Sequence, residues 1–154
     1  MTLFFDGGSR GNPGPSGSGW IIIDDVVTAG YAYHDVGTNN VAEYTGLIHG
    51  LRAAREKGMI KLKCYGDSDL VVKQCNGIYR VRAPHLKPLH AEAVDLLQKT
   101  SSIISHVPRA ENKLADALAN QAMDNASPEP VQWEVEGEPT LASLQTRKRV
   151  KTSD

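Results

Sequence analysis

The hydrophobic period of this sequence changes near residue 38, and that change constrains the fold more than any other feature. Residues 1–5, 17–24 and 28–35 are short apolar or alternating stretches rich in β-branched and aromatic side chains, which predicts three consecutive strands. We expect an antiparallel meander, because consecutive strands joined by turns pair in this way. After the meander, apolar side chains recur three or four positions apart over residues 41–54, which predicts a helix.

Helices and strands alternate in the following segments. Asn39 or Asn40 is suited to cap the first helix, and Gly58 to end it. The same rules predict a strand over 59–67, a helix over 68–77 capped by Ser68, a helix from Pro88 to about residue 99, a strand near 103–107 and a last helix capped by Asn112. This order predicts an α/β fold with a mixed five-stranded sheet and helices on both faces.

The sequence changes character at Ser127, where proline and glutamate follow the last predicted helix. We expect one domain over residues 1–126. The C-terminal tail, residues 127–154, has little apolar content, so we expect it to be flexible and mostly disordered. A short basic run in this tail either attracts phosphate groups or is simply a solvated end; it consists of Arg147, Lys148, Arg149 and Lys151.

The composition excludes several classes of protein. A chain of 154 residues with 40% hydrophobic content fits one core, and a net charge of −1 is unlike that of a strongly basic nucleic-acid binder. Cys64 and Cys75 form no CxxC pair, which argues against a disulfide framework or a zinc site. We recognise no secretion signal and no apolar run of about 20 residues. We therefore expect a soluble, cytoplasmic protein.

Four carboxylates stand near the ends of predicted elements. Asp6 ends the first strand and Asp67 the fourth, while Glu43 lies in the first turn of its helix and Asp116 near the start of the last one. If the two strands are parallel neighbours, the four acids can meet at one carboxyl edge of the sheet. Each acid alone also fits an ordinary turn or helix start.

Clustered carboxylates repel one another unless cations neutralise them or some retain a proton. A site made only of oxygen ligands selects hard ions, Mg²⁺ first and Mn²⁺ second. Two such ions about 4 Å apart suit in-line attack on a phosphodiester, one activating water and the other stabilising the leaving oxygen. The four acids therefore raise the hypothesis of a two-metal nuclease.

Four motifs resemble those of the type 1 ribonuclease H family. They are "DGGSRGNPGPSGSGW", "TNNVAEYTGLIHGL", "YGDSDLVVKQCNG" and "PRAENKLADALAN", which together cover roughly residues 3–123. The resemblance implies an endonuclease that cuts the RNA strand of an RNA/DNA hybrid, leaving 3′-hydroxyl and 5′-phosphate ends. It also implies that Asp6 contacts both metal ions, that Asp116 shares the nucleophile-side ion, and that Glu43 and Asp67 hold the leaving-group-side ion.

The resemblance extends to polar residues near these acids. Asn12, Asn39 and Asn40 are similar to family positions that read the minor groove of the hybrid, and Thr38 to a hydroxyl that grips a DNA phosphate. Arg109 stands nearest the place of a histidine found in many members, and it either contacts the product phosphate or is a solvated loop charge. Turn formation and helix capping are the other interpretation of the asparagines.

The sequence departs from the family at two places. The segment "GIYRVRAPHLKPLH" carries Arg80, Arg82 and Lys87 but no tryptophan, so the basic protrusion of many members is short or absent. Asp69 stands where many members have glutamine. Two other functions stay open, a non-catalytic nucleic-acid-binding module and a structure-selective DNA nuclease. The sequence leaves double-stranded RNA open as an additional substrate, and we expect a monomer.

Overall fold

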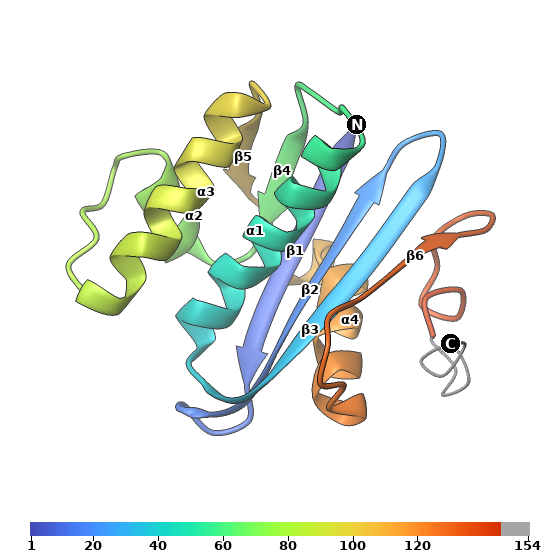
Figure 1. The fold of residues 1–154 in the computed structure, drawn as a ribbon, viewed down its shortest axis with the longest axis horizontal. Coiled ribbons are helices and arrows are strands. Elements are labelled where there is room, and N and C mark those ends of the chain that lie inside the picture. The colour runs from blue at the N-terminus through green and yellow to red at the C-terminus, as the bar shows by residue number, and fades with distance from the viewer. Residues whose placement is uncertain (146–154) are drawn as a thin grey trace.

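The computed structural model of the chain describes residues 1–145. One mixed sheet runs through it, with strand order β5-β4-β1-β2-β3-β6 (Figure 1). The strands are β1 (Thr2–Ser9), β2 (Gly14–Ile23), β3 (Val27–Gly37), β4 (Lys63–Gly66), β5 (Ile103–His106) and β6 (Val131–Val135). The helices are α1 (Asn39–Glu56), α2 (Asp69–Cys75), α3 (Lys87–Lys99) and α4 (Lys113–Asn125), with short helices η1 (Pro84–Leu86) and η2 (Arg109–Glu111).

The sheet has an antiparallel half and a parallel half. β1, β2 and β3 form the predicted meander, and β6 adds to it antiparallel to β3. β4 pairs in parallel with β1, and β5 in parallel with β4. The two halves meet at β1, which therefore has an antiparallel neighbour on one side and a parallel neighbour on the other.

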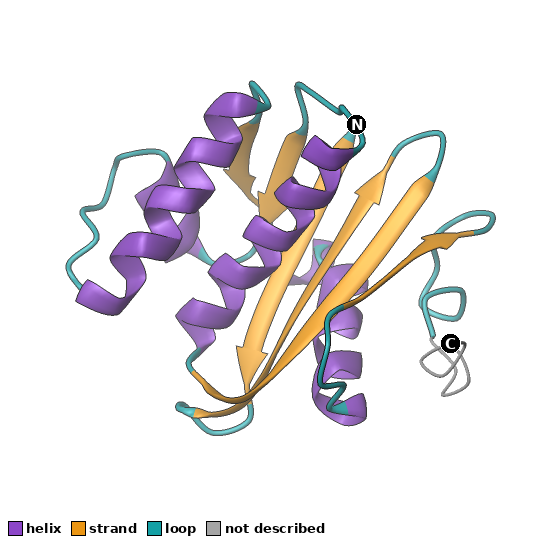
Figure 2. Ribbon diagram, viewed as in Figure 1, coloured by secondary structure: helices purple, strands orange, loops and turns teal. Residues whose placement is uncertain are grey.

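Helices cover both faces of the sheet, as predicted (Figure 2). On one face, α1 packs across β1 and β2 over a cluster of buried side chains that includes Leu3, Phe5, Trp20, Tyr44 and Leu47. On the other face, α4 packs across β2, β1 and β3 over a second cluster that includes Ile21, Ala29, Tyr31, Leu118 and Ala122. The alternation of side chains along β2 supplies both clusters, because successive residues point to opposite faces.

The start of α1 differs from the prediction by one residue. Thr38, and not Asn39 or Asn40, caps the helix: its hydroxyl accepts a 3.3 Å hydrogen bond from the Val41 amide. Both asparagines lie inside the first turn, which frees their side chains for other contacts. At the other end, Gly58 has a positive φ of 73°, which fits the predicted stop.

The C-terminal segment corrects the predicted sheet, which has six strands and not five. Residues 131–135 pair with β3 as β6, and Leu144 is fully buried in the second cluster. Gln121 of α4 donates a 2.7 Å hydrogen bond to the Leu144 carbonyl. The expectation of a disordered tail is therefore wrong for residues 127–145. The basic run from Arg147 to Lys151 lies outside the described residues.

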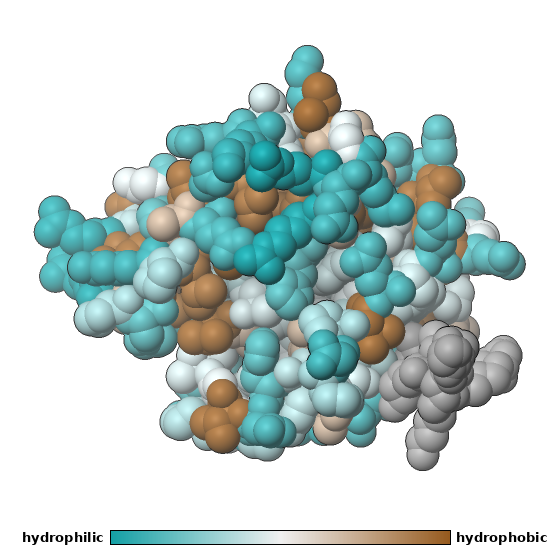
Figure 3. Space-filling view, viewed as in Figure 1, coloured by the Kyte–Doolittle hydropathy of each residue, from teal (hydrophilic) through white to brown (hydrophobic). Residues whose placement is uncertain are grey.

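The face in Figure 3 is mostly hydrophilic, with apolar side chains in small separate patches. Large apolar side chains that are more than half exposed include Val36, Ile78 and Ile103. None of the helices within residues 1–145 has both the length and the apolar character needed to cross a bilayer.

Candidate active site

The candidate site lies where β4 stops and β1 continues. β1 and β4 pair through Phe4 and Tyr65, and β4 ends one residue later. If this parallel register is continued for two more residues along both segments, Asp67 lies beside Asp6. The prediction that Asp6 ends the first strand is wrong, because β1 continues to Ser9 while pairing with β2 alone. The sheet is therefore open on the β4 side of Asp6.

Gly7 allows helix α1 to approach β1 closely. A Cβ atom at this position would lie 2.2 Å from the Ala42 carbonyl carbon and 2.3 Å from the Glu43 amide nitrogen. Ser18 of β2, which is buried, donates a 2.7 Å hydrogen bond to the Ala42 carbonyl and holds the helix there. Glu43 is the fifth residue of α1, just beyond the first turn in which it was predicted.

Gly19 has the same role for helix α4 on the opposite face. It is the cross-strand partner of Asp6 in β2. A Cβ atom on Gly19 would lie 2.6 Å from the Ala115 carbonyl oxygen and 2.6 Å from the Ala119 amide nitrogen. The first turns of α4 therefore pass directly over the strand next to Asp6, and Asp116 lies in this part of the helix.

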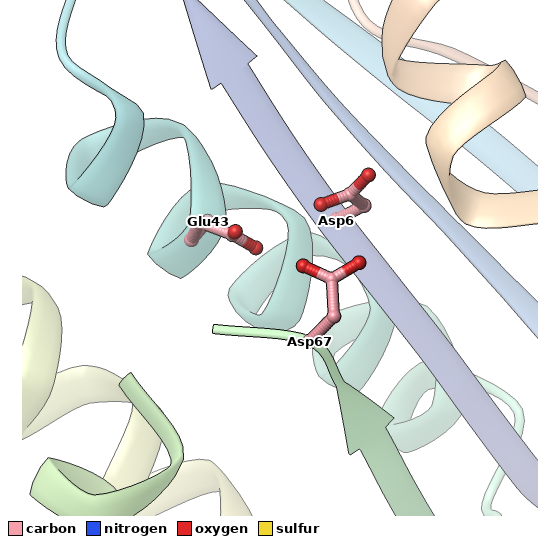
Figure 4. A group of neighbouring side chains, drawn as sticks. All are labelled: Asp6, Glu43 and Asp67. Carbon is pink, nitrogen blue, oxygen red and sulfur yellow. The ribbon is translucent and has the colours of Figure 1, made fainter. Parts of the chain in front are cut away.

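The four predicted acids meet at this edge. Figure 4 shows the carboxylates of Asp6, Glu43 and Asp67 pointing toward one another, and one oxygen of each lies within 4.8 Å of the others. Asp116 lines the same cavity and lies close enough to Asp6 for its charge to raise the pKa of Asp6 further. The acids line a cavity of about 470 Å³, whose other polar lining residues include Arg10, Asn39, Asn40, Ser68, Arg109 and Asn120.

Burial and mutual repulsion hold protons on this cluster. Asp6 is 6% exposed and Glu43 7% exposed. Burial, followed by the charge of Asp67, raises the pKa of Asp6 to about 8, although a backbone hydrogen bond from Gly7 favours the charged form. Burial, followed by the charges of Asp6 and Asp67, raises the pKa of Glu43 well above its ordinary value. Without a cation, the cluster is thus partly protonated near neutral pH.

The donor set fits a divalent cation. Oε1 of Glu43 is buried and has no hydrogen-bond partner. The ion pairs within residues 1–145 include none of the four acids. A buried charge without a partner costs free energy that a bound cation offsets. Carboxylate oxygens are the ligands that Mg²⁺ and Mn²⁺ prefer, so the residues present suit the ions that the sequence predicts.

Comparisons with known proteins identify the family. The sequence model of the reverse transcriptase-like family matches residues 4–122. A ribonuclease HI of Halobacterium salinarum is 43% identical over 130 residues, which are 82% of this chain and 65% of that protein. The structure of LC11-RNase H1, an enzyme isolated from compost and solved in complex with an RNA/DNA hybrid, matches with a TM-score of 0.73 at 35% identity and covers 81% of this chain and 97% of that one. This chain belongs to the type 1 ribonuclease H family.

Some ribonuclease H relatives are longer than this chain. It spans 65% of the Halobacterium protein and 36% of a bifunctional protein of Mycobacterium tuberculosis, which is 44% identical over 132 residues covering 82% of this chain. The likeness therefore concerns one part of those proteins.

Within the ribonuclease H family, this chain is a form without the tryptophan-containing basic protrusion. Residues 76–86, between α2 and α3, contain no tryptophan, and their one helical segment is η1, of three residues. The link exposes Ile78 and Tyr79, and the Tyr79 ring lies beneath the Lys73 ammonium group, 5.0 Å from its centroid. The departure inferred from the sequence is thus present in the fold.

The polar residues that the ribonuclease H resemblance assigns to the hybrid lie at or beside the cavity. Asn39 and Asn40 line it. Asn12 does not line it, but its Oδ1 accepts a 3.1 Å hydrogen bond from the Asn39 amide, while Asn39 Oδ1 accepts one of 2.9 Å from the Ser9 amide. Thr38 also stands outside the lining, as the cap of α1. Asn12 and Asn39 therefore join the glycine-rich turn to the helix start.

Two arginines line the same cavity. Arg109, at the start of η2, lies there as the sequence suggested. Arg10 was not singled out: its Nη2 pairs with Asp124 of α4 at 2.8 Å and donates to Asn120 Oδ1 at 3.4 Å. Asp69 lies outside the cavity lining, on the surface, and pairs with Lys73 at 3.1 Å.

Sequence reasoning missed one residue that touches the acids. Asn112 was predicted as the cap of α4, and it does occupy that position, but its side chain makes no capping hydrogen bond. Instead its Nδ2 donates to the Phe5 carbonyl at 2.9 Å and to Asp67 Oδ2 at 3.1 Å. These partners lie 107 and 45 residues away in the chain, so no local pattern could reveal them.

Proposed function

We propose that this protein is an endoribonuclease that hydrolyses the RNA strand of RNA/DNA hybrids and leaves 3′-hydroxyl and 5′-phosphate ends. The observation that carries the proposal is the convergence of Asp6, Glu43, Asp67 and Asp116 on one cavity with no ion-pair partner among the described residues. Membership of the ribonuclease H family and the hybrid bound by LC11-RNase H1 support the substrate.

The four acids would hold two divalent ions, Mg²⁺ or Mn²⁺. When bound, the ions would supply an activated water and stabilise the leaving oxygen. The protein's own contribution is to fix the ligands: Gly7 and Gly19 let two helices bring Glu43 and Asp116 to the strand that carries Asp6. Because the described residues of one chain contain all four acids, a monomer is sufficient for this chemistry.

The cavity rim would orient the hybrid. Asn39 and Asn40 present amide groups beside the acids, and we propose that they and Asn12 contact the minor groove. Thr38, at the start of α1, would contact a phosphate. Arg109 and Arg10 are cations lining the same cavity, and they would attract backbone phosphates toward an otherwise acidic site.

Cleavage of an end-labelled RNA/DNA hybrid with Mg²⁺ or Mn²⁺ tests the proposal. We expect cleavage by the parent protein and a loss of about a thousandfold or more in Asp116→Asn, because one ligand of the acid cluster is neutralised. The matched control is Asp69→Asn, since Asp69 is a surface acid paired with Lys73, and its cleavage should stay within twofold. Equal cleavage by the parent and Asp116→Asn would refute the proposal.

Substrate changes separate the alternatives. Replacing the ribonucleotides by deoxynucleotides should abolish cleavage; retained cleavage would instead favour a structure-selective DNA nuclease. A non-catalytic binding module would bind the hybrid without cutting it, with an affinity indifferent to Mg²⁺ and to Asp6→Asn. Double-stranded RNA, tested in the same assay, measures how strictly a DNA strand is required.

A further inference from the structure

The Asn112 side chain and backbone join three of the elements that carry the acids. Asn112 is 1% exposed, and its Nδ2 donates to the Phe5 carbonyl and to Asp67 Oδ2. Phe5 directly precedes Asp6 in β1. The Asn112 carbonyl in turn accepts a 3.0 Å hydrogen bond from the Asp116 amide. One residue thus contacts the strand beside the first acid, the side chain of the second and the backbone of the third.

The orientation of this amide is fixed by its neighbours. The Phe5 carbonyl and the Asp67 carboxylate are both acceptors, so only the NH₂ end of Asn112 can face them. The other end, Oδ1, is buried without a hydrogen-bond partner. A helix cap would turn its side-chain oxygen toward the amides of the first turn, which Asn112 does not do. Its side chain therefore contacts the acid cluster and not the helix start.

A neutral donor suits a place beside a cation site. Lysine or arginine could also hold Asp67, but its positive charge would offset the negative charge that attracts a divalent ion. An amide fixes one carboxylate oxygen and leaves the charge and the remaining lone pairs of Asp67 available. Asn112 can therefore fix the position of the Asp67 carboxylate without reducing its negative charge.

We propose that Asn112 is a positioning residue that holds Asp67 in the orientation that binds a divalent cation. The inference rests on the proposed function, because it assumes that the acids are metal ligands. Removing hydrogen-bond partners of metal ligands typically weakens metal affinity or activity by about 10- to 100-fold. Asn112 should thus affect metal binding even when no nucleic acid is present.

Calorimetric titration of the resting protein with Mn²⁺ tests this inference. Asn112→Leu removes both N–H donors while keeping the branched shape of the side chain, and we expect its Mn²⁺ affinity to fall about tenfold. The matched control is Gln121→Leu, which also removes a buried side-chain amide: Gln121 lies in α4, and its Nε2 donates to the Leu144 carbonyl at 2.7 Å. Both variants should lower the thermal midpoint, but Gln121→Leu should keep the parent affinity for Mn²⁺.

Two further measurements keep the test decisive. Asn112→Ser restores one donor and should recover part of the affinity; it also replaces Asn112→Leu if that variant does not fold. In hybrid cleavage, Asn112→Leu should raise the Mg²⁺ concentration for half-maximal rate about tenfold while leaving KM for the hybrid unchanged. Equal Mn²⁺ affinity in the parent and in the Asn112 variants would overturn this inference alone. Absence of Mn²⁺ binding by the parent would overturn the proposed function with it.

Discussion

The acids in the cavity and the acids on the outer helices differ in how their charge is balanced. On α2 and α3, Asp69 pairs with Lys73 and Asp95 with Lys99, each pair spanning one helical turn with both side chains at least one-third exposed. In the cavity, Asp6 and Glu43 are more than nine-tenths buried and form no ion pair. The fold thus balances surface charge from within the chain, whereas the buried charge must be balanced by protons or by cations from solution.

The largest expected consequence is a pH-dependent stability of the metal-free protein. The pKa of Asp6 is about 8 in the folded protein and 3.8 ordinarily. Between these two pH values, the folded state holds a proton on Asp6 that the unfolded chain has released. The contribution of Asp6 to the free energy of unfolding is therefore most favourable below pH 4 and falls as pH rises toward 8. We expect the free energy of unfolding in EDTA to fall by on the order of 4 kcal/mol from pH 5 to pH 8.

Urea denaturation in EDTA at the two pH values measures this fall. Asp6→Asn should remove the part of this fall that comes from Asp6, because an amide has no proton to lose, while Glu43, whose pKa burial also raises, should keep a smaller fall. Asp95→Asn, a matched surface change, should leave it unaltered. Saturating Mg²⁺ should restore stability at pH 8 in the parent protein, since a ligand that binds only the folded state stabilises that state. If the fall is as large in Asp6→Asn as in the parent protein, or is reduced equally in Asp95→Asn, the contrast between buried and surface acids does not hold.

The second prediction concerns the close packing between helix α1, which carries Glu43, and strand β1, which carries Asp6. Gly7→Ala places a methyl group within 2.4 Å of three backbone atoms of α1, which cannot yield as a flexible side chain can. We expect a loss of about 2–3 kcal/mol in stability, by overpacking, together with loss of hybrid cleavage. Gly8→Ala is the neighbouring control, because a Cβ atom there has nothing within 4 Å. Similar stability in the two variants would show that close approach at Gly7 is unnecessary.

The third prediction compares two arginine–carboxylate pairs of similar exposure. Arg10 pairs with Asp124 and lines the cavity, whereas Arg52 pairs with Glu92 outside it. In an Asp116→Asn background, Arg10→Ala should weaken hybrid binding by about 1 kcal/mol and reduce the slope of log affinity against log salt by about one. Arg52→Ala removes the same charge and should change neither. Equal effects would mean that net charge, and not position, attracts the hybrid.

Much of the fold could be predicted from the sequence because its elements have strong local periods. The helix from residue 39 and the strand ending near Asp67 follow from apolar spacing and from turn and capping residues. β6 was not predicted, although Val131, Trp133 and Val135 alternate with polar residues, which is the period of a strand. The segment lies in a mostly polar tail, and its pairing with β3 in the fold shows that it belongs to the sheet. Leu144 likewise gains its burial from α4 and not from its neighbours in the sequence.

In the candidate site, too, some residues could be predicted from the sequence and others depend on contacts between distant segments. The four acids could be predicted because each lies in a family motif near the end of a predicted element, although Asp6 stands inside β1 and not at its end. Asn112 and Arg10 could not be assigned, because their contacts join segments about 45 to 114 residues apart. Thr38 replaced the asparagines as the cap of α1, since Ser, Thr and Asn are close alternatives at this position. Capping rules locate a helix end, but tertiary contacts decide which side chain serves it.

The smallest expected effect lies in the surface pairs themselves. Asp95 and Lys99 are 2.9 Å apart on α3, four residues apart in the favourable order, with about half of each side chain exposed. A double-mutant cycle with Asp95→Asn and Lys99→Gln should give a coupling of about 0.3–0.5 kcal/mol in urea denaturation, because solvent screens the pair and ordering both side chains costs entropy. The coupling should shrink in 1 M salt, where the screening length is about 3 Å. If the coupling were as large as the pH effect of Asp6, burial would not explain the difference between the acids of the cavity and the acids on the surface helices.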